Sequence, residues 1–192
     1  KKIVSVIGGT GFIGKYLVDL LLNKDYYVKI ISRNSKSKKI FLPSSKLGQF
    51  SLLDCNIVDK KRLSNCIKGS KYVINLVGLL EPKGENTFKN AHCLGAKNLT
   101  NLCKEQNIER LIHVSALGVD KNKISSYATT KLEAEQYIKK YKNSLVIRPS
   151  IVCGEEDNFI NLFAKYARFS PFLPLIGGGK TKFQPISVID LA

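Results

Sequence analysis

Apolar residues recur along this chain in two patterns that alternate from its first residues onward. Short continuous apolar runs predict strands buried on both faces, and apolar residues spaced three or four apart predict helices packed on them. The predicted strands are residues 3–7, 27–32, 50–53, 72–77, 110–115 and 145–148. The predicted helices are residues 12–23, 60–68, 86–106 and 125–141. This alternation predicts an α/β fold, a doubly wound parallel sheet of Rossmann type with right-handed crossovers.

A glycine-rich turn, Gly8-Gly9-Thr10-Gly11-Phe12-Ile13-Gly14, follows the first predicted strand directly. An early glycine allows a sharp turn, Gly11 allows backbone to approach an anion, and Gly14 allows the helix to pack tightly on the sheet. The N–H groups at the helix start then face that anion. The spacing fits G-x-x-G-x-x-G from Gly8 or G-x-G-x-x-G from Gly9. Both predict a site for a dinucleotide pyrophosphate, and the alternative is a glycine turn without a ligand.

Arg33 follows the second predicted strand, where NAD-binding proteins of this fold carry an acidic residue for the ribose hydroxyls. A carboxylate would repel a 2′-phosphate, whereas the planar fork of a guanidinium binds one. We therefore predict a preference for NADP(H) over NAD(H). The alternative is that Arg33 is an ordinary solvated charge.

Tyr127 and Lys131 are four residues apart, which makes them neighbours on one face of the predicted helix. That face continues through Ala134, Ile138 and Tyr141. Lys131 therefore points along a buried stripe, where lysine is rare unless it is paired or functional. An ammonium beside a phenol favours the phenolate, which would suit Tyr127 to proton transfer near neutral pH. With Ser115, whose hydroxyl would hold a substrate carbonyl, these two form the predicted catalytic set.

The glycine turn, a strand ending in Ser115 and the Y-x-x-x-K pair together resemble the short-chain dehydrogenase/reductase superfamily. Four further segments are similar to its atypical branch: residues 75–80, 113–118, 148–154 and 183–190. That branch includes the nucleotide-binding accessory subunit of respiratory complex I and bacterial NAD-dependent epimerase/dehydratase-like relatives. The resemblance extends over essentially the whole chain.

The resemblance implies a tightly held NADPH, with contacts distributed along the chain. The implied cofactor-binding residues are Gly8, Thr10, Gly11, Phe12, Ile13 and Gly14 at the pyrophosphate, Arg33 at the 2′-phosphate, Asn56 and Ile57 at the adenine, Val77 and Gly78 along the ribose, and Tyr127, Lys131 and Pro149 at the nicotinamide. Asn56 stands where relatives often carry Asp, and its amide oxygen can still accept from adenine. Lys15 either helps neutralise phosphate or pairs with Asp19.

Only twelve positions separate Ser115 from Tyr127, fewer than is usual in the extended reductases and epimerases that the chain resembles. The loop between them normally helps to enclose substrate, so whether the protein is an enzyme stays open. The resemblance implies an accessory subunit of NADH:quinone oxidoreductase (complex I) with a structural cofactor. The alternative is a stand-alone NADP-dependent reductase, epimerase or dehydratase that uses Ser115, Tyr127 and Lys131. A third, less favoured hypothesis is a redox-sensing binding module.

The net charge of +16 raises the question of an anionic partner. Lysines outnumber arginines 26 to 5 and are scattered, so we expect no nucleic-acid partner. An anionic membrane surface or an acidic protein partner fits the charge better. The resemblance implies other complex I subunits as partners. No apolar run is long enough to span a bilayer. With these features, the resemblance implies a peripheral protein on the cytoplasmic side of a bacterial inner membrane or the matrix side of the mitochondrial inner membrane.

Cysteine and histidine patterns argue against disulfides and metals. Five cysteines with no C-x-x-C pair indicate reduced, mostly structural thiols. His92 and His113 lie among apolar positions, which predicts core packing and no metal site.

The sequence pattern changes after Pro149. Residues 158–169 are amphipathic and aromatic, residues 170–176 contain two prolines, and residues 183–189 predict another strand. Asp190 is predicted to cap a helix at its N-terminus. We expect residues 1–153 to form the dinucleotide-binding domain and residues 154–192 to begin a smaller C-terminal lobe that is truncated here.

Overall fold

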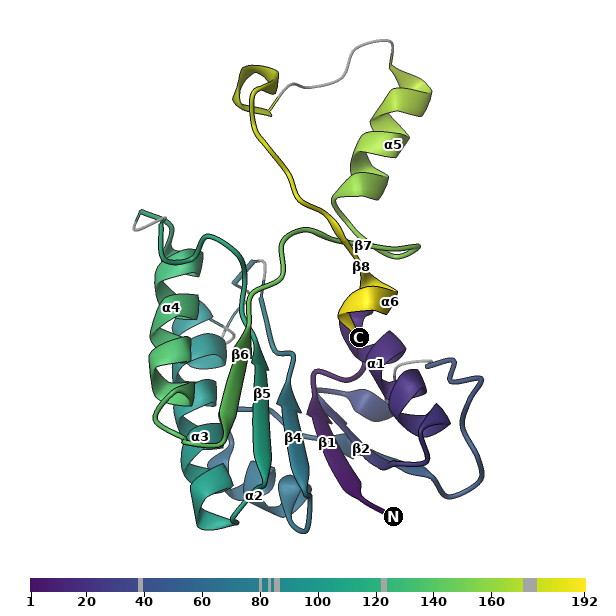
Figure 1. Ribbon diagram of the computed structural model, residues 1–192, viewed down its shortest axis with the longest axis vertical. Helices are drawn as coiled ribbons and strands as arrows, with labels where there is room; N and C mark the ends of the chain where they lie inside the picture. Colours follow the sequence, from purple (N-terminus) through teal and green to yellow (C-terminus); the bar gives the residue numbers. More distant parts are fainter. Residues whose placement is uncertain (38–39, 80, 83, 85–86, 122–123, 171–175) are drawn as a thin grey trace.

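The computed structural model in Figure 1 describes residues 1–37, 40–79, 81–82, 84, 87–121, 124–170 and 176–192. It has two parts. One is a sheet with helices on its faces, and the other projects beyond the carboxyl ends of the strands. This projecting part, residues 154–170 and 176–185, is called the arm below.

The sheet has six parallel strands in the order β3-β2-β1-β4-β5-β6, which confirms the doubly wound α/β fold. The strands are β1 Ile3–Ile7, β2 Tyr27–Ser32, β3 Phe50–Asp54, β4 Tyr72–Asn75, β5 Arg110–Val114 and β6 Ser144–Ile147. Strand order reverses between β1 and β4, whose registers pair Ile7 with Asn75. In sheets of this kind ligands bind outside the carboxyl ends of the strands at that reversal.

Helices cover the two faces of the sheet and enclose two apolar cores. The main helices are α1 Phe12–Asn23, α2 Lys60–Ile67, α3 Gly95–Glu105 and α4 Ser126–Ile138, and a π-helix, η2, covers Lys89–Leu94 just before α3. One core joins the sheet to α2, α3 and α4. The other core joins the sheet to α1 and to Leu42, which lies in the loop between β2 and β3. Burial of Ala134, Ile138 and Tyr141 confirms the predicted stripe along α4.

The C-terminal elements differ from the prediction. Strand β7 (Val152–Cys153) pairs in parallel with β8, which is only Ile186–Ser187, and α6 (Val188–Leu191) follows immediately. The Ser187 hydroxyl accepts a hydrogen bond from the Ile189 N–H (3.2 Å) and caps α6. The predicted strand over residues 183–189 is therefore too long, and the prediction of Asp190 as the N-cap is wrong, because Ser187 already supplies the capping oxygen.

The arm meets the sheet domain at the start of α1. A Cβ atom on Gly154 would lie 2.8 Å from Val188 and 3.1 Å from Phe12, so the chain passes closely between these side chains. Lys15 Nζ lies 2.5 Å from the Glu156 carboxylate, while Asp19 accepts hydrogen bonds from Ser44. The alternative pairing of Lys15 with Asp19 is therefore wrong.

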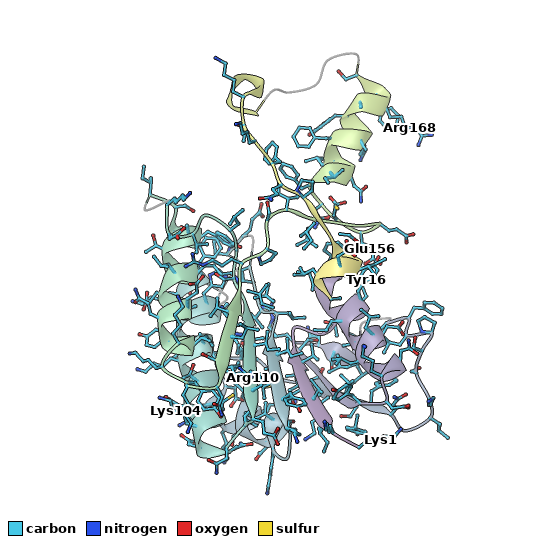
Figure 2. All side chains as sticks on the ribbon, viewed as in Figure 1. Lys1, Tyr16, Lys104, Arg110, Glu156 and Arg168 are labelled. Atoms are coloured by element: carbon cyan, nitrogen blue, oxygen red, sulfur yellow. The ribbon has the colours of Figure 1, made fainter. Side chains whose placement is uncertain are left out.

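The outer half of the arm packs on very little. Helix α5 (Ile160–Phe169) contains no buried residue, and Figure 2 shows Arg168 on it, far from the sheet. Across the part of the chain that the structure describes, no helix combines the length and apolar character needed to cross a membrane.

Candidate nucleotide-binding site

A cleft of about 560 Å³ opens at the carboxyl ends of β1, β2, β3 and β4, at the reversal of strand order. Many of the residues predicted to bind a cofactor line it: Gly8, Thr10, Gly11, Arg33, Asn56, Ile57, Val77 and Gly78. The sheet therefore brings together positions from four separate stretches of sequence. Phe12, Ile13 and Gly14 belong to the first turn of α1, next to this lining.

The glycine turn has the geometry of an anion cradle. Gly8 has a φ of +83°, a backbone conformation that favours glycine, and its N–H donates to the Ile31 carbonyl (2.8 Å). A Cβ atom on Gly14 would lie 2.5 Å from the Gly8 carbonyl oxygen, so only glycine fits there. Gly11 caps α1 without a side-chain hydrogen bond, and the first turn of α1 contains no acidic residue. The turn therefore fits a pyrophosphate bound at the helix N-terminus.

The segment after β3 forms the part of the cleft where adenine binding is predicted. Ile57 is buried, and a Cβ atom on Gly95 of α3 would lie 2.7 Å from its side chain. The close approach of α3 thus fixes Ile57 against the cleft. Asn56 lines the cleft beside it, and its backbone carbonyl accepts from the Asp59 N–H (3.0 Å).

The Lys131 side chain contacts the backbone that forms the cleft wall, on the side away from the cleft. It is only 3% exposed, and its Nζ donates to the carbonyls of Val114 (3.1 Å) and Val77 (3.4 Å), at the ends of β5 and β4. Burial lowers the pKa of Lys131 to about 8, with Glu135 opposing the shift. A Cβ atom on Gly78 would lie 3.4 Å from Nζ, so Gly78 leaves the ammonium close to the cleft.

Tyr127 is held by aromatic packing. Its ring makes edge-to-face contacts with Phe88 (centroids 5.8 Å apart) and His92 (5.6 Å). Burial raises the pKa of the Tyr127 phenol. The expected shift toward phenolate is therefore not found, because the Lys131 ammonium is directed to backbone carbonyls; within the described residues no hydrogen bond joins the two side chains.

Ser115 is buried beside an ion-pair network. It is 5% exposed, and its hydroxyl has no hydrogen-bond partner of normal geometry in the described structure. It lies near the Glu135 carboxylate, whose two oxygens accept from Arg148 Nε and Nη2 at 2.7 Å each. Arg148 also binds Asp120 at 2.9 Å, in the loop between Ser115 and Tyr127. This network links Asp120 of that loop to Glu135 of α4.

The charge on Glu135 is stabilised in spite of its burial. Burial alone would raise the pKa of this carboxyl, but hydrogen bonds from Arg148 and Lys139, with the Ser115 hydroxyl close by, outweigh it and lower the pKa to about 2. Pro149 follows Arg148, and its carbonyl accepts from the Leu117 N–H (2.8 Å). Lys131 therefore lies against the Gly78 end of the cleft, and Ser115 follows Val114, whose carbonyl binds Lys131. Among the described residues that line the cleft, Ser115, Tyr127, Lys131 and Pro149 do not appear.

His92 connects the cleft wall to α4. Its Nε2 accepts from the Leu79 N–H (3.2 Å), so Nδ1 carries the proton and donates to the Thr130 hydroxyl (3.0 Å). Burial, with a smaller effect of Lys131, lowers the pKa of His92 to about 4 and keeps it neutral. Both histidines are buried, which confirms the prediction of core packing. The described residues include no group of His, Cys, Asp or Glu able to hold a metal ion.

Sequence reasoning missed several lining residues: Ser32, Asn34, Cys55, Leu79 and Ala91. The first three directly flank the positions predicted after β2 and β3, so the strand ends themselves were the available signal. Leu79 lies in the segment 75–80, whose similarity to the atypical branch was the available signal, whereas Ala91 comes from a π-helix that has no local sequence signature.

Comparison with known proteins supports the dinucleotide fold. A sequence profile of the NAD dependent epimerase/dehydratase family matches residues 4–192. The enzyme WbmH of Bordetella bronchiseptica, solved in complex with NAD+, superposes with a TM-score of 0.77 at 19% identity, over 99% of this chain and 69% of that chain. At this identity the similarity shows the fold alone.

Two mitochondrial relatives are more similar in sequence. NADH dehydrogenase [ubiquinone] 1 alpha subcomplex subunit 9 of Arabidopsis thaliana is 32% identical, over 99% of this chain and 48% of its own length. The protein of the same name from Dictyostelium discoideum is 31% identical, over 99% of this chain and 53% of its own length. The chain thus spans about half the length of the curated relatives it matches.

Proposed function

Because this chain belongs to the NAD dependent epimerase/dehydratase family, we propose that it is an NADP(H)-binding accessory subunit of NADH:quinone oxidoreductase (complex I) with a structural cofactor. Family membership supports a nicotinamide cofactor, and the two mitochondrial relatives support the assignment to complex I. The observation that carries the structural role is the contrast between an accessible cleft at the glycine turn and an enclosed Ser115.

The preference for NADP(H) rests on Arg33. Its side chain is exposed and lines the cleft just after β2, and its neighbours Ser32 and Asn34 carry no charge. A guanidinium there would bind a 2′-phosphate through charge-assisted hydrogen bonds. No carboxylate at the end of β2 competes for the ribose hydroxyls.

The structural role of the cofactor rests on the other end of the cleft. A substrate carbonyl has to reach the Ser115 hydroxyl, which is covered, and the phenol of Tyr127 has its pKa raised. When bound, a nicotinamide supplies hydride chemistry, but these residues are arranged to pack and to bind backbone rather than to exchange protons with a substrate.

The partners we propose are complex I subunits and an anionic membrane surface. Helix α5 presents Leu162, Tyr166 and Phe169 to solvent beside the cations of Lys165 and Arg168. Such a face, on a chain of net charge +16, suits a peripheral position. We place the protein on the matrix side of the mitochondrial inner membrane or the cytoplasmic side of a bacterial one.

The second candidate function is a stand-alone NADP-dependent reductase, epimerase or dehydratase. It is favoured by the position of Lys131, which binds the Val77 and Val114 carbonyls beside Gly78 and next to Ser115. In this function a change of the loop that contains Asp120 would have to uncover Ser115.

Nucleotide titration tests the preference. NADPH is expected to bind more tightly than NADH, and Arg33→Ala should weaken NADPH binding by about 10- to 100-fold while leaving NADH unchanged. Arg62→Ala, on the exposed side of α2, is the matched control and should change neither. Equal affinity for the two nucleotides in the unmodified protein would contradict the proposed preference.

Native purification from the source organism tests the choice between subunit and enzyme. The chain is expected to co-migrate with NADH:quinone oxidoreductase activity. If it purifies alone, and Tyr127→Phe abolishes a measurable hydride transfer, the stand-alone enzyme is the correct assignment.

A further inference from the structure

The segment that carries Arg33 is a short turn fixed at both ends. On the side of β2, the Thr10 hydroxyl of the glycine turn donates to the Ser32 hydroxyl (2.9 Å), and both residues are buried. The Ser32 carbonyl accepts from the Cys55 N–H (3.0 Å), which continues the pairing of β2 with β3. The first half of the turn is therefore tied to the pyrophosphate cradle and to the sheet.

The other end of the turn is tied to Asp54, the last residue of β3. One oxygen of this carboxylate accepts hydrogen bonds from the Ser35 N–H and from the Ser35 hydroxyl, the latter at 2.7 Å. Ser35 has no exposed surface. Between the two anchors only Arg33 and Asn34 are exposed, and both line the cleft.

The backbone of this tip is itself in an uncommon conformation. Asn34 has a φ of +55°, which non-glycine residues seldom adopt. Its carbonyl accepts from the Ser37 N–H (3.3 Å) and hydroxyl (2.9 Å), in the short 3₁₀ turn η1 (Ser35–Ser37). A strained conformation persists only where its surroundings hold it, and Asp54 supplies the anchor nearest to Arg33 on that side.

We propose that Asp54 is a positioning residue for nucleotide selectivity, because its carboxylate holds Ser35 and thereby directs the Arg33 guanidinium to the 2′-phosphate of NADPH. This inference rests on the proposed NADP(H) binding and adds a residue to it. Asp54 itself is absent from the cleft lining, so it acts through the turn rather than by contact.

Positioning and simple electrostatics predict opposite results for this residue. A carboxylate close to a phosphate repels it, so loss of the charge alone would strengthen NADPH binding. Loss of the anchor instead frees the turn, and a mobile guanidinium loses part of the ordered fork that makes an arginine–phosphate contact strong. The sign of the change therefore separates the two effects.

The experiment is titration of NADPH and NADH against the full chain and four variants. Asp54→Ala is expected to weaken NADPH binding by about tenfold and to leave NADH unchanged. Asp54→Asn keeps an acceptor oxygen for Ser35 without the charge, so it should retain most of the NADPH affinity. Ser35→Ala keeps the backbone N–H bond and should give an intermediate loss.

The fourth variant is a control that removes the same kind of anchor elsewhere. Asp19 accepts from the Ser44 N–H (2.9 Å) and the Ser44 hydroxyl (2.9 Å), in a loop outside the cleft lining. Asp19→Ala should leave the ratio of NADPH to NADH affinity unchanged. Thermal unfolding of every variant separates a loss of selectivity from a loss of fold.

Coupling to Arg33 completes the test. In an Arg33→Ala background, Asp54→Ala is expected to have no further effect on NADPH. Provided that the unmodified protein prefers NADPH, three results would overturn the inference. Asp54→Ala could strengthen NADPH binding, weaken the binding of NADPH and NADH equally, or have its full effect in the Arg33→Ala background. If the unmodified protein shows no such preference, the proposed NADP(H) function is what fails, independently of the Asp54 variants.

Discussion

The two ends of the cleft are built on opposite principles. At the glycine turn, backbone N–H groups, Arg33 and Asn56 face open space, and their supporting contacts lie behind them. At the Gly78 end, the reactive side chains are themselves the supporting contacts: Lys131 binds two backbone carbonyls, and Ser115 is covered. The first end is an open cleft, whereas Lys131 and Ser115 at the second end are buried in the fold.

This difference explains how a fold associated with catalysis can serve to hold a cofactor. Binding requires an exposed cradle, and the cradle is intact. Catalysis additionally requires that a substrate reach a polarising hydroxyl and a proton donor, and the Ser115 hydroxyl is buried. Each prediction below changes one end of the cleft and measures the effect on nucleotide affinity and on stability.

The largest effect is expected from Gly14→Ala at the glycine turn, which forms the open end of the cleft. The new methyl group would lie 2.5 Å from the Gly8 carbonyl oxygen, and this backbone contact cannot relax without displacing the turn. We expect affinity for NADPH and NADH alike to fall by about 100-fold, and the free energy of unfolding to fall by about 1–3 kcal/mol. Isothermal titration and chemical denaturation measure the two quantities.

Gly48→Ala is the control for that loss of stability. Gly48 also requires a left-handed backbone, with φ at +70°, but its Cβ would meet nothing within 4 Å and it lies outside the cleft lining. It should cost about 1 kcal/mol of stability and no affinity. Unchanged nucleotide binding in Gly14→Ala would contradict the pyrophosphate site.

The next largest effect is expected at the Gly78 end of the cleft, where Ser115 and Lys131 are buried and which is called the closed end below. Glu135→Gln removes one charge of a buried pair with Arg148, whose own side chain is only 29% exposed. We expect the free energy of unfolding to fall by about 3 kcal/mol, with NADPH affinity nearly unchanged. The same substitution in the exposed pair of Glu109 with Lys71 should cost less than about 1 kcal/mol. A strong loss of NADPH affinity in Glu135→Gln would show that the closed end also binds the cofactor.

Acid should destabilise the closed end through its buried histidines. Burial lowers the pKa of His92 to about 4 and of His113 to about 3, from an ordinary value of 6.5. Below pH 6.5 the unfolded chain therefore binds protons that the folded chain does not. The free energy of unfolding should fall between pH 6.5 and 4, by roughly 2 kcal/mol for each histidine. A flat stability profile over this range, measured by urea denaturation, would contradict the buried neutral state.

The smallest effect is expected from Tyr127→Phe. Its ring packing on Phe88 and His92 is retained, and within the described residues the hydroxyl has no recorded hydrogen bond. NADPH affinity should change by less than about twofold, and stability by less than about 0.5 kcal/mol. A tenfold loss of affinity would instead place the hydroxyl on the cofactor.

The sheet and the glycine turn could be predicted from local sequence, because each depends on residues close together in the chain. Apolar runs identified all six strands of the main sheet, and the glycine spacing after Ile7 identified the cradle. Burial of Lys131 followed from helical spacing alone. In each case the residues concerned lie close together in the chain, at spacings that can be read directly from the sequence.

The closed end could not be predicted in the same way, because polar side chains distant in sequence form it. Ser115 looked available for catalysis, and only the structure shows that its hydroxyl is buried near Glu135, which pairs with Arg148. Glu135 offered one signal that was missed, since it lies one turn after the buried Lys131. The link from Asp54 to Ser35 spans 19 positions and has no periodic signature.

The redox state of the bound nucleotide tests the central claim most directly. The protein would be isolated from its source within native complex I, and its tightly bound nucleotide identified and quantified before and after turnover with NADH and a quinone. Our account predicts NADPH that stays reduced throughout. Bound NAD(H), or NADPH that becomes oxidised during turnover, would contradict it.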